Sequence, residues 1–372
     1  AATIPIAILM GLYMQIWRKG DVVGATVIGV VLLFLCILSG PWVAAHPEYF
    51  GWLDIDRKAM SILIPIYGFF ASVLPVWLLL LPRDYLSTFL KIGTIGALAI
   101  GIAFVMPNFQ MPAFTDFIHG GGPIVGGPVI PFIFITIACG ALSGFHATQS
   151  PMMARCMTDE KYGRPIFYGA MISEGIVAMI WATAAMAYFG GAEGLNAAAT
   201  AGKTPAIIVD AICNSWLGRL GAIIAIIGVV VCPITSGDTA FRSMRLIIAD
   251  ALKFNQKPIK NRLIVSIPIF IIAYLLCNVD FSTIWKYVGI GNQVLATITL
   301  WTAATYLAKK GKAHWMMSIP ATFLSIVCTT YFLIAPYKVG GLYLSPSISY
   351  PIGAIVGIGL FVLFFTKITR NK

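Results

Sequence analysis

Charged residues are scarce in this sequence. Asp, Glu, Lys and Arg together make up 10% of its 372 residues, whereas apolar residues make up 59%. Because a soluble domain carries about 25% charged residues, this composition excludes an ordinary water-soluble fold. We therefore predict an all-α, polytopic protein that contacts membrane lipid.

Cysteine and histidine are also few, at seven and four residues. No CxxC and no mixed Cys/His spacing of a metal site is present, and Cys36, Cys139, Cys232, Cys277 and Cys328 fall within apolar stretches. This pattern predicts no disulfide framework, no metal site and no bound cofactor.

What the sequence has instead is a series of apolar windows about 20 residues long, the length of a membrane helix. No linker between them is long enough to separate domains, so residues 1–372 are predicted to form one transmembrane domain. We predict eleven spans: Ala1–Trp17, Val22–Leu38, Ala59–Leu81, Phe89–Met106, Val129–Ala154, Ile166–Phe189, Leu217–Phe241, Leu263–Val279, Phe281–Leu307, Ala313–Ala335 and Ile348–Thr366.

The Lys and Arg residues are distributed unevenly between the two sides that these spans separate. Nineteen of the 25 fall on one side, and cytoplasmic loops retain positive charge, which predicts Ala1 outside and Lys372 in the cytoplasm. The net charge of +11 is dispersed over many loops, which is typical of a topology signal and of contact with anionic lipid rather than of a nucleic-acid partner. The chain is predicted to start outside, and its first basic residues follow the first apolar stretch, whereas those of a signal peptide precede it. We therefore expect at least one helix upstream.

Polar and helix-breaking residues interrupt two of the spans. The fifth contains Ser143-Gly144-Phe145-His146-Ala147-Thr148-Gln149-Ser150-Pro151, and the seventh contains Pro233-Ile234-Thr235-Ser236-Gly237-Asp238-Thr239. Backbone that leaves the helix inside a bilayer is tolerated only where protein or a water-filled cavity replaces the lipid. The two breaks therefore predict a solute site.

Each break has its own predicted geometry. In the fifth span Gly144 is the hinge, and Ser150 caps a second helix that begins with Pro151. In the seventh span Pro233 and Gly237 bend the helix. Helix ends inside the membrane present unpaired N–H and C=O groups, which suit an anionic group and a cation respectively.

The predicted depths of the polar residues coincide. Glu174 lies eight residues into the sixth span, or about 12 Å deep at about 1.5 Å per residue, and both breaks fall in the inner half of their spans. We therefore expect His146, Glu174 and Asp238 to meet at one level. Substrate contacts are assigned to His146, Thr148, Gln149 and Ser150, and the coupling ion is assigned to Glu174, Asp238, Thr235, Ser236 and Thr239.

These ionisable residues also have structural interpretations. Asp238 lies four residues before Arg242 on one helical face, so the two could form an ion pair. His146 and Glu174 could each be a hydrogen-bonded interior residue without a role in coupling.

Four stretches resemble one family of bacterial transporters, the carbon-starvation protein A family. They are Gly140-Ala-Leu-Ser-Gly-Phe-His146-Ala-Thr, Gly169-Ala-Met-Ile-Ser-Glu174-Gly-Ile-Val-Ala, Ala2-Thr-Ile-Pro-Ile-Ala7 and Asp238-Thr-Ala-Phe-Arg-Ser-Met-Arg245. The resemblance implies a fold like that of the amino acid, polyamine and organocation transporters, with inverted repeats of five helices each and a first core helix upstream of Ala2.

The resemblance also implies an activity. Members of this family import small peptides or pyruvate across the bacterial inner membrane by proton symport with alternating access, in the response to carbon starvation. Thr235 and Ser236 resemble the hydroxyl pair that binds sodium in related symporters, so sodium is a second possible coupling ion.

A passive channel and an intramembrane hydrolase are the alternatives. Ser143, Gly144 and His146 partly resemble a membrane serine protease, but its Gly-x-Ser-Gly motif requires glycine where Ala141 stands. A serine and a histidine this close in sequence also could not readily adopt the geometry of nucleophile and base. We therefore predict a transporter and not an enzyme.

Overall fold

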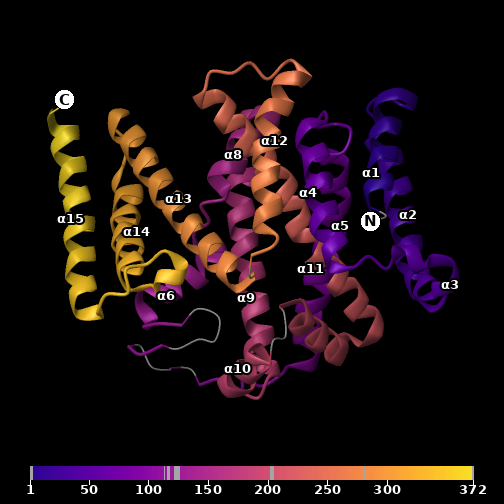
Figure 1. The fold of residues 1–372 in the computed structure, drawn as a ribbon, viewed down its shortest axis with the longest axis horizontal. Coiled ribbons are helices and arrows are strands. Elements are labelled where there is room, and N and C mark those ends of the chain that lie inside the picture. The colour runs from indigo at the N-terminus through magenta and orange to yellow at the C-terminus, as the bar shows by residue number, and fades with distance from the viewer. Residues whose placement is uncertain are drawn as a thin grey trace. The chain divides into compact units, whose positions relative to one another are not determined.

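The computed structural model describes residues 3–112, 114, 118–120, 126–201, 205–279 and 281–370, so the predicted locations of Ala1 and Lys372 lie outside the described residues. All secondary structure in the described part of the chain is helical (Figure 1). The α-helices are α1 (Thr3–Leu12), α2 (Val22–Ala45), α3 (Pro47–Phe50), α4 (Arg57–Val73), α5 (Leu80–Val105), α6 (Val129–Thr136), α7 (Ala138–Ala141), α8 (His146–Cys156), α9 (Ala170–Tyr188), α10 (Ala192–Thr200), α11 (Pro205–Ala251), α12 (Ile259–Leu276), α13 (Phe281–Lys309), α14 (Trp315–Ile334) and α15 (Pro346–Arg370).

The protein is a multi-pass membrane protein. Among the described residues, seven helices are long and apolar enough to cross a membrane, and eight if the bent pair Val129–Thr136 and Cys139–Cys156 is one span. Shorter apolar helices cover Thr3–Trp17, Lys58–Val73 and Ile207–Gly218. Each of the eleven predicted spans overlaps one of these helices or α13, but the number that cross the membrane stays a prediction.

The fourth predicted span begins later than the helix found there. The prediction begins at Phe89, whereas α5 begins at Leu80, nine residues earlier. The apolar window begins after Arg83, so the prediction leaves Arg83 between two spans. Arg83 is nevertheless helical and buried, with 3% of its surface exposed, because it pairs with a carboxylate of the same unit.

The chain divides into two compact units, each built from two separate segments. Unit 1 comprises Ala1–Gln110 and Ile180–Asn278, and unit 2 comprises Met111–Met179 and Val279–Lys372. The first half of α9 therefore belongs to unit 2 and its second half to unit 1.

In unit 1, α5 and α11 pack side by side, and α4 packs against α11 and α12. The contact between α5 and α11 is close because Gly228 has no side chain: a Cβ there would lie 2.1 Å from Thr94 Oγ1. Such close contact through small residues is the usual way in which membrane helices associate.

Two arginines hold the last turn of α4 in unit 1. Arg242 of α11 donates to the carbonyl oxygens of Ala71 and Leu74 at 2.6 and 2.5 Å, and Arg262 of α12 donates to that of Val73 at 3.2 Å. The final carbonyls of a helix have no partner within it, so these guanidinium groups satisfy acceptors that would otherwise be left open.

Aspartate side chains cap two helix starts in unit 1. Asp21 accepts from the Gly24 backbone N–H at 2.8 Å before α2, and Asp56 accepts from the Ala59 N–H at 2.8 Å before α4. The Gly24 N–H and then the Tyr13 hydroxyl hold the pKa of Asp21 below its ordinary value.

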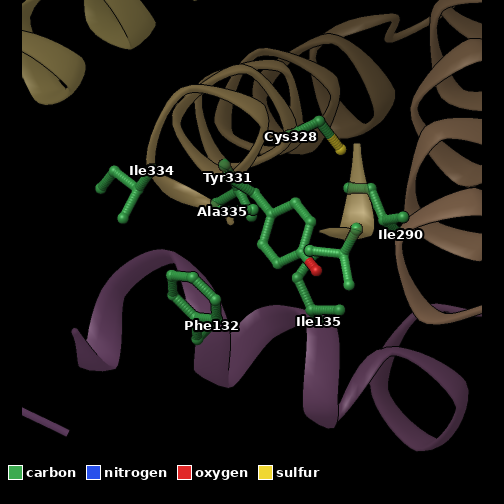
Figure 2. Packing of buried hydrophobic residues seen from close by; sticks show 9 residues of the cluster. Phe132, Ile135, Ile290, Cys328, Tyr331, Ile334 and Ala335 are labelled. Atoms are coloured by element: carbon green, nitrogen blue, oxygen red, sulfur yellow. The ribbon is translucent and has the colours of Figure 1, made fainter. Parts of the chain in front are cut away.

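In unit 2 the core lies between α6, α13 and α14 (Figure 2). Tyr331 of α14 is 1% exposed and packs against Phe132 of α6 with ring centroids 5.0 Å apart, while Ile290 approaches from α13. The cluster fixes α6, the helix that leads into the first predicted break.

We expect Tyr331→Ala to destabilise the protein by about 3–5 kcal/mol, the usual cost of truncating a large buried aromatic residue. Tyr337→Ala is the matched control, because Tyr337 is 72% exposed. Thermal unfolding of both purified variants in detergent measures the difference, and an equal melting temperature for the two would contradict the packing described.

Candidate functional site

The predicted break in the fifth span is present. α6 ends at Thr136, α7 covers Ala138–Ala141, and α8 begins at His146, so residues 142–145 lie outside any helix. The segments Val129–Thr136 and Cys139–Cys156 are bent by 64° relative to each other.

The start of the helix after this break was predicted wrongly. α8 begins at His146, so Ser150 is not its N-cap, and Pro151 lies inside the helix rather than at its first position. The side chain of Phe145, the residue before α8, does not cap the helix. The reason is that α13 supplies the cap: Asn292 Oδ1 accepts from the Phe145 backbone N–H at 2.9 Å, which allows the helix to start earlier.

Gly144 allows this contact with α13. A Cβ on Gly144 would lie 2.1 Å from the Asn292 carbonyl oxygen and 2.6 Å from the Ala296 nitrogen, so only glycine permits the backbones to approach this closely. Ser143 Oγ also lies 3.4 Å from Asn292 Oδ1. The break is thus a backbone turn seated on α13 and satisfied by an amide side chain.

His146 and Glu174 meet beside the break. His146 Nε2 lies 2.9 Å from Glu174 Oε2, and the side chains are 34% and 31% exposed. His146 Nδ1 lies 3.2 Å from the Ser143 carbonyl oxygen, and the Cys139 thiol donates to Glu174 Oε1 at 3.2 Å. Both nitrogens of the histidine ring therefore face oxygen atoms.

The other residues predicted to contact substrate follow His146 on α8. Thr148, Gln149 and Ser150 are half-buried on its first turns. The Thr148 hydroxyl donates to the Phe145 carbonyl oxygen at 2.7 Å, a local bond that helps the turn return to helix.

The predicted break in the seventh span is absent. α11 is helical from Pro205 to Ala251, and its only non-helical dihedral angles are at Gly218, so neither Pro233 nor Gly237 interrupts it. Membrane helices tolerate proline where side-chain hydroxyls and neighbouring helices satisfy the freed backbone groups. The carbonyl that loses its N–H partner to Pro233 is that of Val229. α11 packs against α4 and α5 here, and the Thr235 and Thr239 hydroxyls bond other carbonyls of the helix, those of Cys232 at 3.0 Å and Thr235 at 3.2 Å.

Asp238 lies on this continuous helix and is 3% exposed. Its Oδ2 accepts from the Tyr67 hydroxyl of α4 at 2.7 Å and from Arg83 Nη1 of α5. The ion pair considered with Arg242 is not formed, because that guanidinium donates to the carbonyls at the end of α4. Thr235 is buried and accepts from Lys91 Nζ at 2.7 Å, whereas Ser236 is exposed.

The structure thus brings His146 and Glu174 together within unit 2, and it places Asp238 in unit 1 with Tyr67 and Arg83. The expected meeting of all three predicted residues stays a prediction.

Sequence reasoning missed four polar residues of these networks: Tyr67, Arg83, Lys91 and Asn292. A signal was available for Asn292, since it lies with Gln293 in the middle of a predicted span, and polar residues there are functional by default. Arg83 gave no such signal because it lies before the apolar window, and Lys91 gave none because it lies only two residues inside the start of that window, where a lysine can reach the membrane surface. Within the described residues, no group of three or more His, Cys, Asp or Glu side chains could hold a metal ion.

The described residues thus define an all-helical, multi-pass membrane protein that contains one bent pair of helices. The chain belongs to the carbon starvation protein CstA family, whose profile matches residues 1–221 and 206–331. The proteins that it resembles are transporters, not enzymes.

Three relatives illustrate the similarity. Peptide transporter CstA of Campylobacter jejuni is 35% identical over 91% of this chain and 58% of its own length, and that of Bacillus subtilis is 34% identical over 92% and 64%. The pyruvate/proton symporter BtsT of Escherichia coli is 47% identical over 50% of this chain and 26% of its own length. The chain thus spans less than two thirds of these relatives. No solved structure matches it.

We expect Gly144→Ala to destabilise the protein by about 1–3 kcal/mol, the usual cost of overpacking, because its methyl group would push α8 away from Asn292. Gly291→Ala is the control, because a Cβ there would meet no atom within 4 Å. Thermal unfolding compares the two, and an effect of Gly144→Ala no larger than that of the control would contradict the close contact.

Proposed function

We propose that this chain is part of a secondary active transporter that imports small peptides or pyruvate by proton symport across the bacterial inner membrane. Family membership supports this proposal, as do relatives named as peptide transporters and as a pyruvate/proton symporter. The proposed fold has eleven spans, with inverted repeats of five helices, and works by alternating access. The uneven distribution of Lys and Arg supports an N-terminal side outside the inner membrane and a cytoplasmic C-terminal side.

The hydrogen bonds of His146 carry the proposal of proton coupling. Its Nδ1 faces the Ser143 carbonyl oxygen, which can only accept, so Nδ1 bears a hydrogen. If Glu174 were ionised and the ring neutral, two lone pairs would then face each other across 2.9 Å. One further proton between Nε2 and Oε2 removes this repulsion, either as imidazolium with carboxylate or as imidazole with carboxylic acid.

The pair is also suited to exchange this proton. Both side chains are about one third exposed, and they border the non-helical residues 142–145. We therefore assign proton binding to Glu174 and His146, with Thr148, Gln149 and Ser150 contacting substrate beside them. Gly144 is the proposed hinge of this segment.

The proposal also assigns roles in ion coupling and helix bending to residues of α11. Asp238 and Thr239 serve ion coupling, and Pro233 and Gly237 are points where the helix can bend. The hydroxyl pair Thr235 and Ser236 was the basis for sodium coupling. Lys91 Nζ donates to Thr235 Oγ1 at 2.7 Å, and an ammonium group at this hydroxyl disfavours a sodium ion there, which supports the proton as the coupling ion.

We expect Glu174→Gln to abolish accumulation of substrate driven by a pH gradient while exchange of labelled for unlabelled substrate persists, because the amide cannot take up and release a proton. The measurement is uptake of radiolabelled pyruvate, dipeptides and tripeptides into proteoliposomes of the full-length protein. Glu160→Gln is the matched control, since Glu160 is exposed in a short 3-10 turn.

Gradient-driven accumulation by Glu174→Gln equal to that of the control would contradict proton coupling at this pair. Uptake by the unmodified protein that only equilibrates substrate, with or without a gradient, would indicate a passive channel instead. Accumulation that follows a sodium gradient and not a pH gradient would assign sodium as the coupling ion.

A further inference from the structure

Arg83 is buried in unit 1 in a network that the proton-binding pair does not use. It lies on α5, 3% exposed, and its Nη1 donates both to Asp238 Oδ2 of α11 and to the Tyr67 hydroxyl of α4. Tyr67 donates in turn to the same carboxylate oxygen at 2.7 Å. Three helices thus meet around one guanidinium and one carboxylate.

The guanidinium uses only part of its donor capacity. Both of its hydrogen bonds come from Nη1, and its buried Nε has no acceptor among the described residues. Buried donors are almost always paired, and the Nε atoms of Arg242 and Arg245 are the other buried guanidinium donors of the described residues without an acceptor. Of the three arginines, Arg83 is the one whose guanidinium donates to a carboxylate. The edge formed by Nε and Nη2 is one of the two on which a guanidinium binds a carboxylate through two parallel hydrogen bonds.

The surrounding charges also favour an anion. The charged and titratable groups that act on Asp238 and on its neighbour Asp84 are Tyr67 of α4, Arg83 and Lys91 of α5, and Arg242 of α11. Three basic groups therefore face two carboxylates, which leaves an excess of one positive charge. In a low-dielectric interior such an excess attracts an anionic group.

We infer that Arg83 binds the carboxylate of the transported substrate, and that Asp238 is an internal carboxylate that occupies this arginine when substrate is absent. This inference rests on the proposed function, because both proposed substrates share one group: pyruvate is a carboxylate, and a peptide ends in one. A single guanidinium can therefore serve both.

Charge balance indicates how the two carboxylates exchange. When a proton binds Asp238, the aspartate becomes neutral and keeps a hydrogen bond with Tyr67, while Arg83 loses its anionic partner. The incoming substrate then supplies one negative charge to the guanidinium. The net charge of the network is the same before and after, so anionic substrate and proton enter together.

The test measures binding to the purified full-length protein with three ligands: labelled pyruvate, dialanine and dialanine amide, which lacks the carboxylate. The variants are Arg83→Gln, Asp238→Asn and the double variant, with Arg18→Gln as the control because Arg18 is 73% exposed in its side chain. Arg83→Gln alone leaves the Asp238 carboxylate buried without its partner and can therefore misfold. The double variant removes both charges and so avoids this problem.

We expect Arg83→Gln and the double variant to weaken binding of pyruvate and dialanine at least about 30-fold, as for loss of one partner of a buried charge pair. Dialanine amide should bind all of the proteins equally weakly. Asp238→Asn should bind the two carboxylates about tenfold or more tightly, because the competing internal carboxylate is gone.

Two outcomes would overturn the inference separately from the proposed function. If the unmodified protein takes up pyruvate or peptides but the double variant still prefers dialanine to its amide, Arg83 does not bind the carboxylate. If Asp238→Asn binds pyruvate no more tightly than the Arg18→Gln control, Asp238 does not compete for the arginine. Absence of any uptake and binding by the unmodified protein would instead overturn the proposed function itself, and this inference with it.

Discussion

The central constraint on this chain is the free-energy cost of a polar or charged group that lies within apolar membrane helices without a partner inside the protein. Water is absent from the bilayer core, so an unpaired backbone N–H or an unpaired charge is costly there. Each unit contains a pair of ionisable side chains that meets this constraint: His146 lies against Glu174 in unit 2, and Arg83 pairs with Asp238 in unit 1. Many of the hydrogen bonds and ion pairs among the described residues avoid this cost.

The two pairs differ in their surroundings and therefore in the chemistry that they suit. In unit 2 the helix is interrupted, and Asn292 accepts the hydrogen bond of the Phe145 N–H, so a backbone turn buried against α13 lies beside a partly exposed His/Glu pair. In unit 1 the helix is continuous, and the polar atoms are side chains enclosed between α4, α5 and α11. An accessible pair suits the exchange of protons, whereas an enclosed guanidinium suits the selection of an anion.

Sequence reasoning predicted the helices well where apolar residues alone decide. α2 begins at Val22 and α13 at Phe281, as predicted, because the residues before them end the apolar windows. It also located the break at Gly144 and the partners His146 and Glu174. It failed at Pro233 and Gly237, because α11 packs against α4 and α5 and stays helical through both residues. It could not find Arg83, because a charged residue at the edge of an apolar window is assigned to a loop unless its partner on another helix is known.

The proton shared by His146 and Glu174 is the central claim, and ¹⁵N NMR of the His146 ring in full-length protein in lipid tests it most directly. The account predicts that Nδ1 keeps its hydrogen across the physiological pH range, and that the Nε2 signal changes when Glu174 is replaced by glutamine. A ring whose Nδ1 lacks a hydrogen, or whose Nε2 signal is the same with and without the glutamate, would contradict it.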